Sequence, residues 1–184
     1  MTKTLWKNGT FYADKWDQAA DESAFSSDLI ISLEEWNTKD WSGHNGKLGL
    51  NVHPLDDLFE VEKILHNFDL VVVNFPNFAN GTAFSTARMI RDRFGFEGEI
   101  RARGAYILDQ MPMLIRCGVD TFEISSEAVR AGLNRGAWPD LPRYYQFALD
   151  GEGNLARIKR GLDPKRPWIG ESIALDEEPS RKVA

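Results

Sequence analysis

The sequence predicts an α/β fold with a mostly parallel sheet, in which strands and helices alternate along the chain. Residues 70–73 form a continuous apolar run, which is typical of a parallel strand buried on both faces. Gly95 and Gly118 follow two helical patterns, as glycines just past helix ends do. The alternation between residues 48 and 135 favours parallel pairing through right-handed crossovers. An open doubly wound sheet and a partial barrel both satisfy this pattern.

A β-hairpin precedes the repeating unit. Asn8-Gly9 separates two short strand-like segments, residues 5–7 and 10–12, and this dipeptide accepts the positive φ angles that a two-residue hairpin turn requires. Residues 14–27 are polar, and we expect a loop there.

The segment after this loop predicts a strand over residues 29–33, because its β-branched side chains suit a pleated surface. Trp36 and Trp41 follow in a polar stretch. They either cover an apolar edge of the core or form an aromatic platform for a ligand.

The repeating unit is predicted from its apolar spacing and its punctuation by proline, glycine and serine. The expected strands cover residues 48–52, 69–74, 99–103 and 120–124, with a further strand at 144–149, and the expected helices cover 55–65, 85–94, 109–117 and 128–135.

Length and composition indicate one domain. The chain has 184 residues, of which 42% are hydrophobic, and this supports a single sizeable core. We expect one α/β domain over residues 1–150, made of a hairpin region at 1–47 and a repeating core at 48–149. Residues 151–184 are rich in glycine, proline and charge, which predicts a loosely packed C-terminal tail.

Charge and cysteine content exclude several classes of protein. A net charge of −6 disfavours nucleic-acid binding, which depends on neutralising phosphates. A single cysteine, Cys117, permits no internal disulfide and is typical of a reducing compartment. The sequence has no apolar signal segment and no run of about 20 apolar residues, so we expect a soluble cytoplasmic protein without a membrane span.

Candidate ligand-binding residues follow the strands of the predicted sheet. In parallel α/β folds, ligands bind beyond the carboxyl ends of the strands, so loop residues at these positions should converge on one rim. The candidates in these loops are Asn74, Asn80, Gly81, Thr82, Tyr106, Asp109, Gln110 and Ser125. The glycine turn at Gly81 either offers free N–H groups to an anion or is a plain capped helix start.

Arg101 and Arg103 are two residues apart on a predicted buried strand, so both side chains should point to the same face. A buried guanidinium group needs a charged or hydrogen-bonded partner. Either the arginines form a salt-bridge layer, with Glu123 as a candidate partner, or at least one of them binds an oxyanion. Arg88 could assist from the following helix.

Other titratable residues have both a structural and a chemical interpretation. Asp109 is most simply a helix N-cap, and its alternative role is an acid or base. His53 could be a general base or a structural residue before Pro54. Cys117 is predicted to be a buried, inert thiol. No cysteine and histidine cluster has the spacing of metal ligands, so we expect no structural metal.

A set of motifs in the repeating core resembles one uncharacterised bacterial family, a domain of unknown function that often carries an oxidoreductase label. These motifs comprise Phe84-Ser85, Ala87-Arg88, Ile90-Arg91, Gly95-Phe96, residues 98–102, Gly104, Asp109-Gln110, residues 116–120 and Phe122. The resemblance covers roughly residues 48–146. Family members are commonly encoded beside the sulfite or nitrite reductase haemoprotein, which implies a role in assimilatory sulfate reduction. The chain departs from the family at Asn80-Gly81-Thr82, where members usually have Asp-Gly-Arg.

Three functions remain open on this basis. The first is a non-catalytic or weakly catalytic accessory protein of sulfite reduction that acts through the reductase haemoprotein, as the resemblance implies, and binds a small oxyanion at the rim, as the arginines of the third strand suggest. The second is an oxidoreductase-type enzyme that acts on a small anionic substrate with a flavin or nicotinamide cofactor. The third is a homo-oligomeric scaffold with Trp36, Trp41 and Trp168 as contacts.

Overall fold

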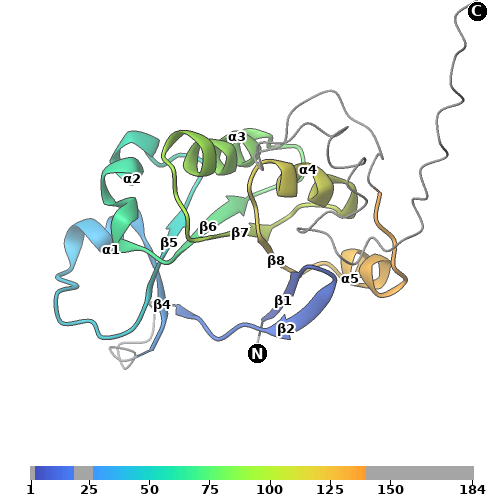
Figure 1. Ribbon diagram of the computed structural model, residues 1–184, viewed down its shortest axis with the longest axis horizontal. Helices are drawn as coiled ribbons and strands as arrows, with labels where there is room; N and C mark the ends of the chain where they lie inside the picture. The colour runs from blue at the N-terminus through green and yellow to red at the C-terminus, as the bar shows by residue number, and fades with distance from the viewer. Residues whose placement is uncertain (1–2, 19–26, 140–184) are drawn as a thin grey trace, which may run out of the picture.

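The computed structural model describes residues 3–18 and 27–139, which form one mixed sheet covered by helices on one side (Figure 1). Eight strands in the described ranges have the order β2-β1-β8-β7-β6-β5-β4-β3. The strands are β1 (Thr4–Lys7), β2 (Thr10–Ala13), β3 (Asp17–Gln18), β4 (Leu29–Ser32), β5 (Leu48–Val52), β6 (Leu70–Phe75), β7 (Glu99–Gly104) and β8 (Thr121–Glu123). The α-helices are α1 (Leu33–Thr38), α2 (Leu58–Ile64), α3 (Thr82–Arg88), α4 (Met111–Arg116) and α5 (Glu127–Asn134). The short helical turns are η1 (Leu65–Asn67), η2 (Met89–Arg93) and η3 (Leu108–Gln110).

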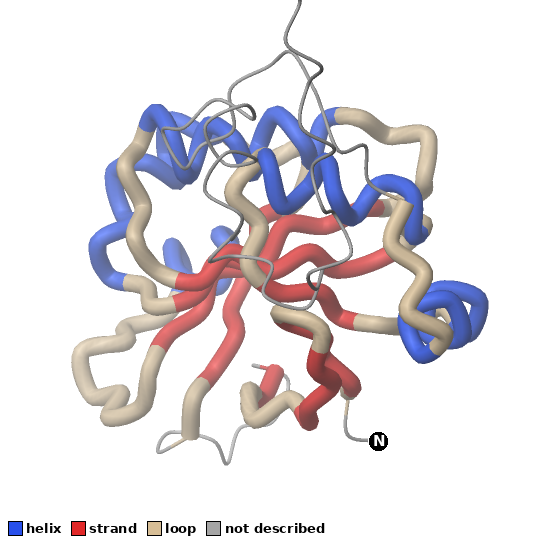
Figure 2. The backbone as a smooth tube through the Cα atoms, turned by 45° about the vertical axis from the view of Figure 1, so that its right-hand side comes forward, coloured by secondary structure: helices blue, strands red, loops and turns tan. Residues whose placement is uncertain are grey.

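The predicted α/β fold with a mostly parallel sheet is confirmed. Strands β3 to β8 are parallel neighbours in chain order, and only β1 is antiparallel to its neighbours β2 and β8. Right-handed crossovers that always advance in one direction place all connecting helices on the same face. Figure 2 shows this arrangement, with helices above the strands. A doubly wound sheet would reverse its strand order at a switch point, and the described strands contain no such reversal.

The sheet curls into a partial barrel, which is one of the two architectures that the sequence pattern allowed. Its edge strands β2 and β3 are joined by residues 14–16 alone. Eight flat strands would separate these edges by about 34 Å, at about 4.8 Å per neighbour. The connection spans at most about 14 Å, at about 3.6 Å per residue. The two edges therefore approach each other, and the ribbon in Figure 1 follows a curved wall from β4 to β2.

The two faces of the curled sheet have different chemistry. Side chains of alternate strand residues, such as Val71, Val73 and Ile100, pack beneath the helices in the main core. The opposite, inner face carries Val72 and a buried Arg101. A second apolar cluster on this inner face joins Ile30, Leu70 and Val72 to Trp16 of the connection.

Local signals explain the turns and several helix ends. Asn8 and Gly9 have φ angles of 50° and 82°, which confirms the predicted hairpin turn. Ser32 and Glu35 form a reciprocal capping box at the start of α1. Gly95 and Gly118 both have positive φ and follow the ends of η2 and α4, as the sequence predicts.

Several predicted boundaries are wrong. Residues 14–27 are not entirely loop, because Asp17–Gln18 forms the edge strand β3. Leu33 belongs to α1 and not to the preceding strand. The helix expected over residues 55–65 begins at Leu58, because Asp57 caps it, and the side chain of Leu55 is 89% exposed.

Two predictions lie outside the described residues, namely the strand at residues 144–149 and the tail at 151–184 with Trp168. The single-domain division, which includes residues 140–150, therefore stays a prediction. Across residues 3–18 and 27–139, none of the helices has the length and apolar character needed to cross a membrane.

Candidate functional site

Asn74 lies at the carboxyl end of β6, opposite Arg103 of β7. Its side-chain amide donates to Asn51 Oδ1 at 2.6 Å and to the Val52 carbonyl at 2.9 Å. The side chain is half-buried, and its amide donors hold the ends of β5 and β6 together. Asn74 is thus at the predicted rim, with its donors engaged inside the protein.

Arg103 and Arg101 share the inner face of β7, as their spacing predicts. Arg103 Nε donates to Glu123 Oε2 at 2.7 Å, which confirms the predicted partner. The other carboxylate oxygen of Glu123 lies 3.3 Å from Lys3 Nζ. An ionic chain therefore links β7, β8 and the residue that precedes β1.

Arg101 is buried and lies between two carboxylates. Its Nη1 donates to both oxygens of Asp14, at 3.0 and 3.1 Å, and its Nε donates to Glu99 Oε1 at 3.1 Å. The side chains of Arg101 and Asp14 are only 2% and 3% exposed. Because Asp14 belongs to the connection between β2 and β3, this ion pair fastens that connection to the middle of the sheet.

The electrostatic balance of this inner face disfavours an added anion. Three cationic groups, those of Lys3, Arg101 and Arg103, are accompanied by three carboxylates, those of Asp14, Glu99 and Glu123. An anion placed beside Arg101 would have to displace Asp14 or be repelled by it, and Arg101 is too buried for direct access.

Tyr106 is part of the core. Its hydroxyl donates to the Glu123 carbonyl at 2.7 Å, and its ring makes edge contacts with Phe75 and Phe122. Burial, reinforced by the Glu123 charge, raises the pKa of Tyr106 far above its usual value. The phenol is therefore neutral and acts as a bridge between the loop after β7 and the end of β8.

Two further contacts hold the ends of β6, β7 and β8 together. Ser125 is exposed, and its hydroxyl donates to the Gly104 carbonyl at 3.4 Å. Gly104 has a φ of 110°, and a Cβ atom there would lie 2.3 Å from the Phe75 carbonyl oxygen. Glycine is required at this position by both the backbone angle and the close approach.

The loop between β6 and α3 is fixed by side chains that were predicted to bind a ligand. Asn80 Oδ1 accepts hydrogen bonds from the Thr82 N–H at 2.9 Å and the Thr82 hydroxyl at 2.6 Å. Gly81 is the exposed N-cap position of α3. Asn80 thus forms a side-chain turn that leads into α3, whose N-cap residue Gly81 takes part in no side-chain cap hydrogen bond.

Gln110 connects this loop to the next one. Its amide nitrogen donates to the Phe78 carbonyl at 2.8 Å, and its amide oxygen accepts from the Ile107 N–H at 3.1 Å. The side chains of Phe78 and Ile107 remain 61% and 45% exposed. Sequence reasoning missed this apolar pair, although two apolar residues in polar loops after neighbouring strands are a visible signal.

Asp109 and Arg88 do not belong to a shared cluster. Asp109 lies within η3 and is exposed, so its predicted N-cap role is wrong, because Gln110 satisfies the Ile107 N–H at the start of this turn. Arg88 ends α3, at the opposite end from the rim, where its Nε lies 3.9 Å from Asp92.

Cys117 is buried at the carboxyl end of α4, as expected. Burial raises the pKa of its thiol, and the charges of Arg88 and Arg116 offset this effect in part. His53 is exposed at the end of β5, and its backbone N–H donates to Asp56. Within residues 3–18 and 27–139, His, Cys, Asp and Glu form no group of three that could hold a metal ion.

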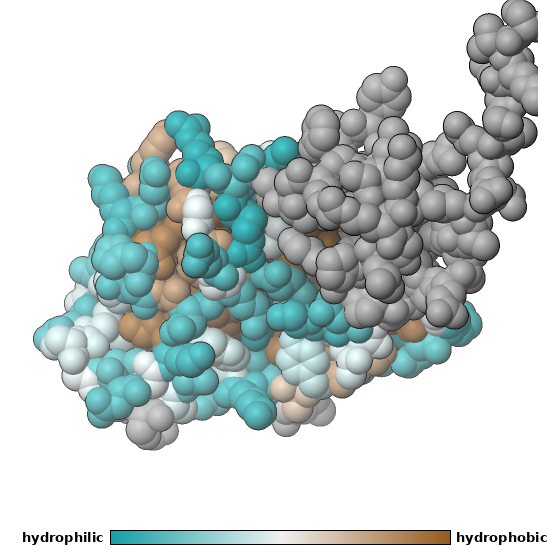
Figure 3. Space-filling model, in the orientation of Figure 1, coloured by the Kyte–Doolittle hydropathy of each residue, from teal (hydrophilic) through white to brown (hydrophobic). Residues whose placement is uncertain are grey.

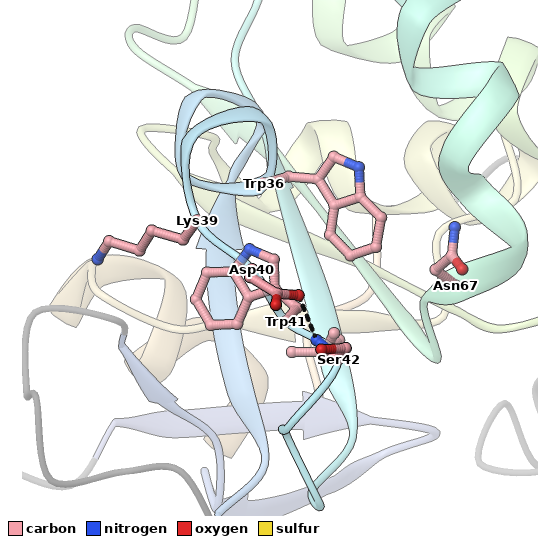
Figure 4. A pocket seen from close by; sticks show the side chains of 7 residues that line it. Trp36, Lys39, Asp40, Trp41, Ser42 and Asn67 are labelled. Carbon is pink, nitrogen blue, oxygen red and sulfur yellow. Dashed lines mark hydrogen bonds between the residues drawn. The ribbon is translucent and has the colours of Figure 1, made fainter.

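A cleft of about 450 Å³ lies away from this rim, beside the amino ends of β5 and β6 (Figure 4). Its lining residues are Trp36, Lys39, Asp40, Trp41, Ser42, Leu48 and Asn67. Trp36 and Trp41 also pack against the main core, which matches their predicted role as a cover of its edge.

A family model described as bacterial protein of unknown function (DUF934) matches residues 49–155, which is more than half of the chain. The chain belongs to this family. The DUF934 match begins in β5 and includes every described element from there to α5, so the rim lies within it and the hairpin lies outside. The chain has no match among curated proteins.

Proposed function

We propose that this DUF934 protein is a non-catalytic accessory protein of assimilatory sulfite reduction in the cytoplasm, which docks a partner protein on its rim. The observation that carries the proposal is the exposed pair Phe78 and Ile107, on loops that follow the neighbouring strands β6 and β7. Exposed aromatic and aliphatic side chains that are held in place are typical anchors of protein interfaces.

Preorganisation supports a docking role for this pair. Gln110 bonds both loops, and Asn80 fixes the turn into α3, so little conformational freedom would be lost on binding. Leu55, on the loop after the next strand β5, adds a third exposed apolar side chain at the same end of the sheet. In this view, the polar residues Asn80 and Gln110 serve to hold the loops in place, and their presence at the rim does not require a small-molecule ligand.

The identity of the partner rests on the family resemblance. It points to the haemoprotein of sulfite reductase, because that protein is the expected genomic neighbour. The pairing of Arg101 and Arg103 with carboxylates favours a protein partner over an oxyanion ligand at this rim. The packing of Trp36 and Trp41 on their own core leaves less of their surface for a homo-oligomeric scaffold.

Copurification of the full chain with the sulfite reductase haemoprotein tests the proposal. We expect the wild type to retain the haemoprotein, and the double variant Phe78→Ser, Ile107→Ser to lose it, since each anchor contributes about 1–2 kcal/mol. Phe59→Ser is the matched control, because Phe59 is 56% exposed on α2, outside the two loops that carry the pair, and its ring lies under Arg93. Retention by the double variant, or equal loss in the control, would contradict docking at this surface.

The enzyme and oxyanion alternatives have a separate measurement. Thermal unfolding with and without flavin, nicotinamide nucleotides, sulfite and sulfate detects any ligand that binds the folded chain preferentially, because such binding raises the melting temperature. We expect no shift. A saturable shift with sulfite that disappears in Arg103→Gln would replace partner docking with oxyanion binding.

A further inference from the structure

We propose that the cleft beside α1 is a binding site for a small organic cation, which lies against the indole rings of Trp36 and Trp41 and beside the Asp40 carboxylate. Its volume of about 450 Å³ falls in the range of small-molecule sites. Figure 4 shows Asp40 and Ser42 beside Trp41, with Trp36 above them in this view and Asn67 beyond Trp36. In the space-filling view, apolar surface is visible near α1 and α2 among polar residues (Figure 3).

Both indole rings are held in fixed positions. The Trp41 Nε1–H donates to the Glu35 carbonyl at 3.2 Å, and the His44 ring makes an edge contact with Trp41. Trp36 packs against Phe68, with ring centroids 5.0 Å apart. Because these contacts belong to α1 and the core, the aromatic walls exist before a ligand arrives, and indole faces attract cations through their negative π surface.

Asp40 supplies the negative charge at the cleft. Its Oδ1 accepts from the Ser42 N–H at 3.0 Å, and this bond lowers the pKa of the fully exposed carboxyl, so Asp40 is ionised at neutral pH. Lys39, the other charged residue at the cleft, extends away from the indoles in Figure 4, and its Nζ lies 4.0 Å from Glu35. A carboxylate that lines the same cleft as two indole rings fits a cation such as a quaternary ammonium group.

The cleft is independent of the proposed docking rim. Leu48 starts β5 and Asn67 precedes β6, so the cleft lies at the amino ends of the parallel strands, whereas Phe78 and Ile107 follow their carboxyl ends. Failure of one proposal therefore leaves the other intact.

Titration of the full chain with choline, at constant chloride concentration, tests the cation site. The indole N–H signals in a nitrogen–proton correlation spectrum report each tryptophan, and Trp36→Phe and Trp41→Phe assign the two signals. We expect both signals to shift along one saturable curve. Asp40→Asn should weaken choline binding at least about fivefold, and the neutral isostere 3,3-dimethyl-1-butanol should bind at least about fivefold more weakly than choline.

Asp92→Asn is the matched control, because Asp92 is an exposed carboxylate on η2 and should leave choline binding unchanged. Non-saturating shifts, shifts of all indole signals together, or equal affinity for the neutral isostere would overturn the proposal. Equal choline affinity in Asp40→Asn and the wild type would overturn it as well. The indole signals themselves show whether each variant is folded, so loss of binding is separable from loss of structure.

Discussion

Replacing Asp14 with alanine should destabilise the protein by about 3 kcal/mol. Removing one partner of a buried ion pair typically costs about 3–5 kcal/mol, because the other charge stays buried. Asp14 and Arg101 are 3% and 2% exposed and are joined by two hydrogen bonds, which places the pair in this class. Arg101 keeps Glu99, which is 26% exposed, so the low end of the range applies.

Urea unfolding at neutral pH measures this loss. With a slope of about 2 kcal/mol per molar for a domain of this size, the midpoint should fall by about 1.5 M. Asp92→Ala is the control, since Asp92 pairs with Arg88 at 3.9 Å and both side chains are exposed, so it should change the free energy of unfolding by less than about 0.5 kcal/mol.

A second variant separates the ion pair from the position of the connection. The double substitution Asp14→Leu, Arg101→Met replaces the pair by apolar groups, and such replacements are often neutral. The charge that loses its partner is that of Glu99, which is 26% exposed and therefore keeps contact with water. We expect it to recover most of the stability that Asp14→Ala loses. A loss below about 1 kcal/mol in Asp14→Ala would refute the reasoning, because Asp14 would then contribute no more than a surface charge.

Two further predictions concern buried titratable side chains. Tyr106→Phe should cost about 1 kcal/mol near pH 8, where it loses the hydrogen bond to Glu123. Burial raises the Tyr106 pKa above its usual 10.0, so the contribution of the neutral phenol to folding is full below about pH 10 and declines progressively as the pH rises toward the higher folded-state pKa. Urea unfolding at about pH 11 should therefore show a smaller difference between variant and wild type. The Cys117 thiol, whose pKa is raised by burial, should react with an aromatic disulfide reagent at least about 100-fold more slowly in native buffer than in urea, with Cys117→Ser as the control. Equal rates in both conditions would contradict a buried thiol.

The parallel core was predictable because its signals are local. The apolar run in β6 records burial on both faces without reference to other segments. Asn8-Gly9 specifies its turn through backbone angles alone, and Gly118 ends α4 in the same way. Such features depend on the residue itself and its immediate neighbours.

Closure of the partial barrel was not predictable, because it depends on where distant segments meet. Asp14 is 87 residues from Arg101 in the chain, and it lies in a polar run with no strand pattern. The predicted start of α2 was wrong for a different reason. Two consecutive aspartates compete there, and Asp56 bonds the His53 N–H in a turn, which leaves Asp57 as the cap.

The candidate site illustrates the limit of positional rules. Asn74 lies at the carboxyl end of β6 and Ser125 follows β8, so the structure brings them to the same end of the sheet. Position does not specify the internal partner of a side chain, however: the amide donors of Asn74 hold strand ends together, and the side-chain oxygen of Asn80 holds a turn. Arg88 does not lie at the rim, because it is the last residue of α3 and the helix runs away from that end of the sheet.

The ionic inner face explains why recognition is expected at the two ends of the barrel. An apolar interior would stabilise a curled sheet at least as well as the Asp14–Arg101 pair does, so stability alone does not account for the pair. We infer that the pair fixes the connection in a single position. Any displacement would separate the buried carboxylate from the guanidinium group and leave both charges unpaired, which is costly. We expect a wall fixed in this way to hold its end loops in place, so that an exposed side chain such as Phe78 binds without prior ordering.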